Sequence, residues 1–125
     1  MMPWDVRFAA EFEREFQFLQ LAVRESLLAA TRLLKDYGPQ LGRPNVDTLK
    51  GSKFPNMKEL RFSVEGSAWR VAFAFDPTRR GIILVAGDKS GVSEARFYRS
   101  LIAKGDRRYA AHLAQLSAMR SQQGC

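Results

Sequence analysis

Hydrophobic and polar residues alternate along residues 57–64 and 68–76, and an apolar run rich in β-branched residues begins the segment 82–89. Alternation with a period of two is typical of a strand that packs one face against a core, and a short apolar run is typical of a buried strand. Turn-forming residues separate the three segments, at residues 65–67 and 77–81. The pattern therefore predicts three consecutive antiparallel strands joined by tight turns.

The same alternation divides the side chains of the first two strands between two faces of the sheet. Seven apolar residues are expected to point into the core: Leu60, Phe62, Val64, Trp69, Val71, Phe73 and Phe75. Glu59, Arg61 and Arg70 then lie together on the other face, where Ala72 and Ala74 are expected to leave a low, open surface. A carboxylate among guanidiniums fits either a solvated face with cross-strand ion pairs or a functional site.

Residues 4–8 also alternate, and they predict a short first strand that pairs with the later sheet. Helical spacing follows until Gly38-Pro39, a pair that ends a helix. The residues expected on the buried helical face are Phe8, Phe12, Phe16, Leu19, Val23, Leu27, Ala30, Leu34 and Tyr37. One helix over residues 9–37 would be about 43 Å long, more than the width of so small a domain, so we expect a kink or turn near residues 19–21.

Residues 40–55 are rich in turn formers and predict a loop. Lys50 and Lys53 flank Gly51-Ser52 there, so two ammonium groups and backbone N–H groups can approach a phosphate. The spacing is not that of a P-loop, and a solvated loop is the alternative.

After residue 89 the apolar spacing predicts one or two closing helices, separated near Gly105. His112, the only histidine, is expected on a helix surface. The expected organisation is a single domain over residues 1–119, followed by a disordered tail over residues 120–125.

Composition limits the class of protein. The chain has 125 residues, 46% of them hydrophobic, which is enough for one globular core, and its net charge of +7 favours an anionic partner. The N-terminus lacks the layout of a secretion signal and no apolar run approaches the ~20 residues that span a bilayer, so a cytoplasmic protein is expected. Cys125 is the only cysteine, which excludes an intrachain disulfide and a cysteine-based metal site.

Six short segments, taken in order along the chain, carry a family resemblance: Leu49-Lys50-Gly51, Lys58-Glu59-Leu60-Arg61, Trp69-Arg70-Val71, Phe75-Asp76, Gly87-Asp88-Lys89 and Phe97-Tyr98. Together with the order strand, helical pair, three antiparallel strands, they resemble the HigB/RelE superfamily of toxins from bacterial toxin–antitoxin pairs, specifically its phage-derived HigB-like branch. The resemblance covers residues 4–116. It implies an α+β, RelE-like fold, in which an N-terminal strand and a helical pair pack on a small, mainly antiparallel twisted sheet with one or more C-terminal helices.

The resemblance also implies a function. Toxins of this superfamily enter the ribosomal A site and cleave mRNA as endoribonucleases, with no metal or other cofactor. An antitoxin silences them, commonly a HigA-like protein with a helix-turn-helix DNA-binding domain. The expected partners are therefore mRNA, the ribosome and an antitoxin, with operator DNA reached only through the antitoxin and no membrane partner.

Four residues match positions with roles in the superfamily. Arg70 matches the arginine of the central strand that contacts the scissile phosphate. Lys89 stands where many members have a basic residue after the last strand, and Tyr98 where many have a tyrosine that orients the nucleophile or stacks on a base. Glu59 occupies a position that is lysine in some members and a carboxylate, proposed as general base, in others. The chain departs from the pattern in having no histidine near the site.

The chemistry can also be derived from the residues. RNA carries its own nucleophile, the 2′-hydroxyl, so an enzyme must align it, accept its proton, stabilise the phosphorane and protonate the leaving 5′-oxygen. Glu59 is the only carboxylate predicted on the basic face and is the candidate base; Arg70 is the candidate charge stabiliser, supported by Arg61 and Lys89. Five further cations are expected to bind RNA: Lys50, Lys53, Lys58, Arg79 and Arg96.

Two other classes of function fit the same sequence. In a non-catalytic nucleic-acid module, the basic face binds phosphates while Trp69 or Tyr98 stacks on bases. In a protein-interaction module, the basic surface receives an acidic partner such as an antitoxin. Substitution of Glu59 separates the nucleic-acid module from the enzyme, since only the enzyme loses activity while it keeps RNA binding. Cell growth separates the interaction module, because induction of a toxin stops growth and translation and a co-expressed neighbouring open reading frame restores growth.

Overall fold

The structure, a computed structural model, describes residues 3–123. Nine elements follow one another there: β1 (Val6–Phe8), α1 (Ala10–Phe16), α2 (Leu21–Tyr37), the 3-10 helix η1 (Gly38–Gln40), β2 (Val46–Thr48), β3 (Lys58–Val64), β4 (Ser67–Phe75), β5 (Gly81–Asp88) and α3 (Glu94–Gln123). Their arrangement confirms the predicted α+β fold class.

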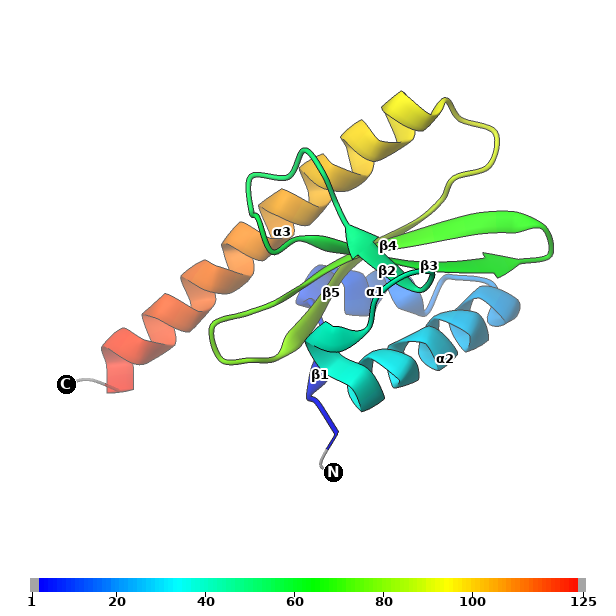
Figure 1. Cartoon of the computed structure of the whole chain (residues 1–125). Helices are drawn as coiled ribbons and strands as arrows, with labels where there is room; N and C mark the ends of the chain where they lie inside the picture. The colour runs from blue at the N-terminus through cyan, green and yellow to red at the C-terminus, as the bar shows by residue number, and fades with distance from the viewer. Residues whose placement is uncertain (1–2, 124–125) are drawn as a thin grey trace.

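The five strands form one sheet in the order β1-β5-β4-β3-β2 (Figure 1). β1 runs parallel to β5 and the other neighbours are antiparallel, so the predicted hairpins and the pairing of the first strand with the later sheet are confirmed. The sequence did not predict β2. Its three residues lie inside the segment expected to be a loop. Alternation over three residues is too short to be recognised between turn formers on both sides.

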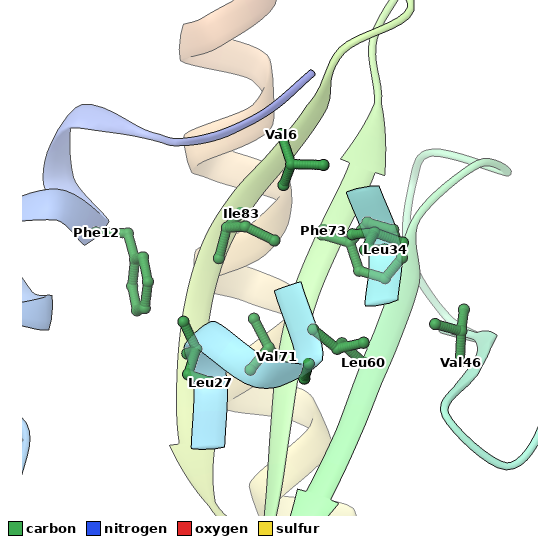
Figure 2. Close-up of a cluster of buried hydrophobic side chains, with 10 residues drawn as sticks. Val6, Phe12, Leu27, Leu34, Val46, Leu60, Val71, Phe73 and Ile83 are labelled. Atoms are coloured by element: carbon green, nitrogen blue, oxygen red, sulfur yellow. The ribbon is translucent and has the colours of Figure 1, made fainter. Parts of the chain in front are cut away.

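Helices α1 and α2 cover one face of the sheet. Phe12 of α1 and Leu27 and Leu34 of α2 pack with Val71 and Phe73 of β4, and none of the five is more than 1% exposed (Figure 2). Burial of this apolar stripe is the main force that holds the helical pair to the sheet. This face is therefore filled by the core, and Glu59, Arg61 and Arg70 lie on the opposite face, next to the part that α3 covers.

The helical pair breaks where the length argument placed it, because residues 17–20 separate α1 from α2. The expected burial of Tyr37 is wrong, since this residue is 57% exposed. The next position of the buried face is Gly38, which lies against the Trp4 ring, so Trp4 fills the space beneath the end of the helix.

Helix α3 covers the other face of the sheet. Ala72 and Ala74 are fully buried, so the expectation that they leave an open surface is wrong. A β-carbon on Gly105 of α3 would come within 3.2 Å of the Ala72 side chain, which shows how closely the helix approaches. Gly105 is thus a packing contact and not a helix break.

α3 is one continuous helix that runs to Gln123. Of the two alternatives, one closing helix or two, the structure has one, with no separation near Gly105. Residues 120–123 of the predicted tail are the last residues of this helix, and the part of the tail that includes Cys125 lies outside the described residues. No helix within residues 3–123 combines the length and the apolar character needed to cross a membrane.

An arginine on α3 fixes this helix to α1 and the sheet. The Arg108 side chain is 5% exposed, donates to both oxygens of Glu15 at 2.7 Å and donates to the Leu84 carbonyl at 2.8 Å. Its Nε lies 3.0 Å from Glu11. We call Arg108, Glu11 and Glu15 the Arg108 cluster.

His112 is not the surface residue that the sequence predicted. Its Nε2 lies 2.7 Å from Oδ2 of Asp76, whose side chain is fully buried. The other Asp76 oxygen accepts hydrogen bonds from Thr78 and from the Arg80 backbone. Burial favours the neutral acid, but these hydrogen bonds, from His112 first, outweigh it and lower the pKa of Asp76. His112 therefore helps to fix the β4–β5 turn against α3.

Candidate active site

The β3–β4 hairpin gathers the three charged residues that alternation placed on one face. Arg61 and Arg70 are directly opposite each other in the register, and Glu59 is opposite Ala72, the second residue beyond Arg70. Side chains two residues apart on a strand share a face, so Glu59 lies diagonally across from Arg70. The predicted grouping of the three is confirmed.

The Glu59 carboxylate is the centre of this group. Its side chain is only 6% exposed. Oε1 accepts a 2.7 Å hydrogen bond from the Tyr98 hydroxyl and lies 3.4 Å from Nε of Arg70, while Oε2 lies 3.3 Å from Nη2 of Arg61. We call Glu59, Arg61, Arg70 and Tyr98 the Glu59 cluster.

Tyr98 reaches Glu59 from the first turns of α3. Its neighbour Phe97 packs close to Gly87 of β5, where a β-carbon would lie 2.9 Å from the phenyl ring, and this contact anchors the start of the helix. Burial first, and then the hydrogen bond to Glu59, raise the pKa of Tyr98 above its ordinary value. Tyr98 is therefore a neutral hydrogen-bond donor to Glu59 at physiological pH.

Lys89 joins the cluster through Tyr98 and not through Glu59. Its Nζ lies 5.4 Å from the centre of the Tyr98 ring, within the range of a cation–π interaction. It also forms a 2.7 Å ion pair with Glu94, the first residue of α3, and this hydrogen bond lowers the pKa of Glu94. All five predicted catalytic residues thus lie in one region, with Lys89 on its edge.

An open hollow of about 380 Å³ is lined by Glu59, Arg61 and Tyr98 of the cluster, while Arg70 and Lys89 are not among its lining residues. Its lining comes from β2 and the loop after it, from β3 and from the start of α3: Asp47, Thr48, Leu49, Lys50, Glu59, Arg61, Glu94 and Tyr98. Sequence reasoning missed Asp47 and Glu94. Asp47 lies on the unpredicted strand β2, and Glu94 lies in a segment that was assigned only to a helix.

Of the five cations expected to bind RNA, only Lys50 lines this hollow. Lys53 is on the same loop, but its backbone N–H donates to Asp106 of α3 at 2.9 Å, and Ser52 also donates to that carboxylate. Asp106 thereby fixes the loop, with Lys53 beside α3 at a different hollow.

The other three cations lie elsewhere. Lys58 lies two residues before Leu60 on β3, so both face the α2 side of the sheet. Lys58 therefore lies on the opposite face from Glu59. Arg79 lies in the β4–β5 turn, with its guanidinium 5.1 Å from the centre of the Trp4 ring. Arg96 lines a separate hollow between β5 and α3. Three-dimensional placement therefore separates these cations from the site.

Fold and site together define a class of protein: a small α+β domain with a helical pair on one face of the sheet and a charged site on the other, beside the start of a long helix. The fold is similar to that of a doubly substituted form of the Escherichia coli toxin RelE in the free state, with a TM-score of 0.55. The match covers 82% of this chain and 97% of that chain at 18% sequence identity, a level at which the likeness concerns the fold alone.

Residues 14–110 match the family described as "Phage derived protein Gp49-like (DUF891)", and the chain belongs to this family. Two Mycobacterium tuberculosis proteins are similar over most of the chain. One, "Putative toxin HigB2", is 43% identical over 114 residues, which are 88% of this chain and 56% of that protein. The other, "Putative toxin HigB3", is 44% identical over 98 residues, 78% of this chain and 83% of that protein. The resemblance to the phage-derived HigB-like branch is thereby confirmed.

The chain spans only 56% of the length of HigB2. Among residues 3–123, no group of three His, Cys, Asp or Glu side chains is placed to hold a metal ion.

Proposed function

We propose that this chain is the toxin of a toxin–antitoxin pair and acts in the cytoplasm as an endoribonuclease that cleaves mRNA on the ribosome. The names of its relatives and its RelE-like fold support the toxin role. The observation that carries the enzymatic role is the setting of Glu59, a nearly buried carboxylate in contact with two arginines and a tyrosine hydroxyl beside an open hollow.

The proposed reaction uses the 2′-hydroxyl of RNA as the nucleophile. Glu59 accepts its proton while the 2′-oxygen forms a bond to phosphorus, and the bond from phosphorus to the 5′-oxygen breaks. The products are a 2′,3′-cyclic phosphate and a 5′-hydroxyl. Because the nucleophile belongs to the substrate, the protein contributes alignment, a base and charge stabilisation.

Each residue of the Glu59 cluster has a role in this scheme, and so does Lys89 at its edge. Arg70, with a side chain 16% exposed, and Arg61, 33% exposed, stabilise the extra negative charge of the phosphorane, because a guanidinium fork fits phosphate oxygens. Tyr98 orients Glu59 through their 2.7 Å hydrogen bond. Lys89 protonates the leaving 5′-oxygen, since an ammonium group can release a proton and a guanidinium does not.

The toxin role also predicts a partner. An antitoxin, HigA-like with a helix-turn-helix domain, binds this chain and carries it to operator DNA. A neighbouring open reading frame should encode a small protein that co-purifies with the chain and restores growth on co-expression. Absence of such a protein would contradict the toxin role without bearing on cleavage.

One observation favours a second candidate, a non-catalytic module that binds RNA or an antitoxin. Arg61 and Arg70 contact Glu59, and Lys89 contacts Glu94, so an ion-pair network alone accounts for the grouping. In such a module Glu59→Gln leaves function intact or tightens RNA binding, because it removes a negative charge.

The test is mRNA cleavage mapping by primer extension in bacterial cells after brief induction of the wild type, Arg70→Ala and Arg79→Ala. Arg79 is the matched control. It is an exposed arginine in the turn between β4 and β5, and its guanidinium lies over the Trp4 ring. We expect cuts confined to translated frames with the wild type and with Arg79→Ala, and none with Arg70→Ala. An uncut transcript pool and normal growth with the wild type would favour the module.

A further inference from the structure

Two carboxylates on the rim of the hollow hold the cations that a phosphate would need. Asp47 of β2 lies 3.4 Å from Arg61, and Glu94 of α3 lies 2.7 Å from Lys89. The two acids come from elements on either side of Glu59, and both line the hollow. The positive charges of the site are therefore largely matched within the protein.

Asp47 occupies a position that is unfavourable for the sheet alone. It is directly opposite Glu59 in the β2–β3 register, and like charges directly opposite each other destabilise a strand pair. Nη2 of Arg61 lies between them, 3.3 Å from Glu59 and 3.4 Å from Asp47. One guanidinium nitrogen is thus shared by two carboxylates, and the same Asp47 oxygen also accepts a hydrogen bond from Nε of Arg43 at 3.1 Å.

Glu94 matches the second cation. Its side chain is 70% exposed, whereas that of Lys89 is 25% exposed, so Glu94 lies on the solvent side of the pair. The lowered pKa of Glu94, caused first by the hydrogen bond from Lys89, keeps it ionised. An exposed ion pair of this kind is weak enough for another anion to displace.

We propose that Asp47 and Glu94 act as internal competitors of RNA phosphates: they occupy Arg61 and Lys89 in the free protein and so weaken its binding to single-stranded RNA. RNA that another macromolecule, such as the ribosome, holds against the hollow displaces both carboxylates from these cations. The identity of the ligand as RNA rests on the proposed function. This competition restricts binding to RNA that is already held at the hollow.

The test measures RNA affinity without cleavage. Fluorescence anisotropy with labelled 2′-O-methyl single-stranded RNA reports binding alone, because this RNA lacks the nucleophile. The variants are Asp47→Asn, Glu94→Gln and the double variant. Matched controls are Asp36→Asn and Glu25→Gln, exposed acids of α2 that have no side-chain partner among residues 3–123 and change the net charge equally.

We expect each rim substitution to tighten binding about two- to fivefold, the range that a weak exposed ion pair corresponds to. Each freed cation that adds a phosphate contact should steepen the slope of log K against log salt by about 0.7. Glu94→Gln frees Lys89 and should give about 0.7, whereas Asp47→Asn frees both Arg61 and Arg43 and should give about 0.7 to 1.4. The α2 controls should leave the slope unchanged. Thermal unfolding identifies a variant that fails to fold, and Glu94→Gln, at an exposed residue, keeps the test decisive if Asp47→Asn fails.

Unchanged or weaker binding by folded Glu94→Gln, or equal tightening by the α2 controls, would overturn the inference. This outcome is distinguishable from failure of the proposed function. If the wild type cleaves mRNA in cells but the rim variants bind no more tightly, only the inference fails. If the rim variants bind more tightly and the wild type does not cleave, the competitors exist in a binding module.

Discussion

Two arginine–carboxylate clusters include residues of α3, and they differ in the lengths of their contacts and in their exposure to solvent. In the Arg108 cluster the guanidinium is 5% exposed and reaches both oxygens of Glu15 at 2.7 Å and the Leu84 carbonyl at 2.8 Å. In the Glu59 cluster the two guanidiniums lie 3.3 and 3.4 Å from the carboxylate, and a hollow of about 380 Å³ is lined by Glu59, Arg61 and Tyr98.

This difference distinguishes a cluster that stabilises the fold from a cluster that can react with a substrate. In short, bidentate contacts the N–H donors of a guanidinium are already hydrogen-bonded within the protein, and the side chain is fixed in one geometry. Longer contacts around one carboxylate, with two arginines and a tyrosine on it, leave the guanidiniums able to turn to a phosphate. We therefore assign the Arg108 cluster to the stability of the fold and the Glu59 cluster to chemistry.

The largest expected effect on stability follows from opening the closed cluster. Arg108→Met should lower the free energy of unfolding by about 2–4 kcal/mol, because it removes hydrogen bonds to Glu15 and to a buried carbonyl. Denaturant unfolding measures this. Arg107→Ala is the control: the Arg107 side chain is 61% exposed and its only ion pair within residues 3–123 is with Glu11, so its loss should cost no more than about 0.5 kcal/mol. Equal losses for both would contradict the assignment.

A smaller effect, on cleavage and not on stability, is expected in the open cluster. Tyr98→Phe keeps the ring but removes the hydroxyl that orients Glu59, and should slow RNA cleavage about 10- to 100-fold. Because the pKa of Tyr98 is raised, the residue stays protonated, and the ratio of wild-type to variant rates should be constant between about pH 6 and 9. A ratio that collapses toward high pH would show that Tyr98 acts by losing its proton.

The smallest effect concerns acid stability of the closed cluster. The hydrogen bond from Arg108 lowers the pKa of Glu15 below its ordinary 4.5, so the folded state binds fewer protons than the unfolded state just below that pH. The stability this provides is present above about pH 4.5 and is lost as the pH falls through the lower folded value. Screening at the half-exposed Glu15 keeps it below about 1 kcal/mol. Unfolding measured against pH should show a shallower acid slope for Arg108→Met than for the wild type; a steeper one would contradict the pairing.

Local pattern predicted much of the fold and the centre of the site. Alternation alone placed Glu59, Arg61 and Arg70 on one face, because strand parity is a property of neighbouring residues. The break between α1 and α2 followed from length, since a continuous helix would not fit the domain.

The errors arose where long-range contacts decide the outcome. Gly105 looked like a helix break, but it is the point where α3 approaches Ala72. Asp47 was missed because its strand has only three residues and is held by pairing with β3. The positions of Arg79 and Arg96 depend on tertiary structure, which charge alone does not reveal.

The most direct test of this account compares the two carboxylates in one cleavage assay. Glu59→Gln and Glu15→Gln make the same chemical change, one in the open cluster and one in the closed cluster. Primer extension on mRNA from cells that express equal amounts of each variant should show no cuts with Glu59→Gln and the wild-type cuts with Glu15→Gln. Wild-type cuts with Glu59→Gln would contradict the account, because the Glu59 cluster would then not carry the chemistry.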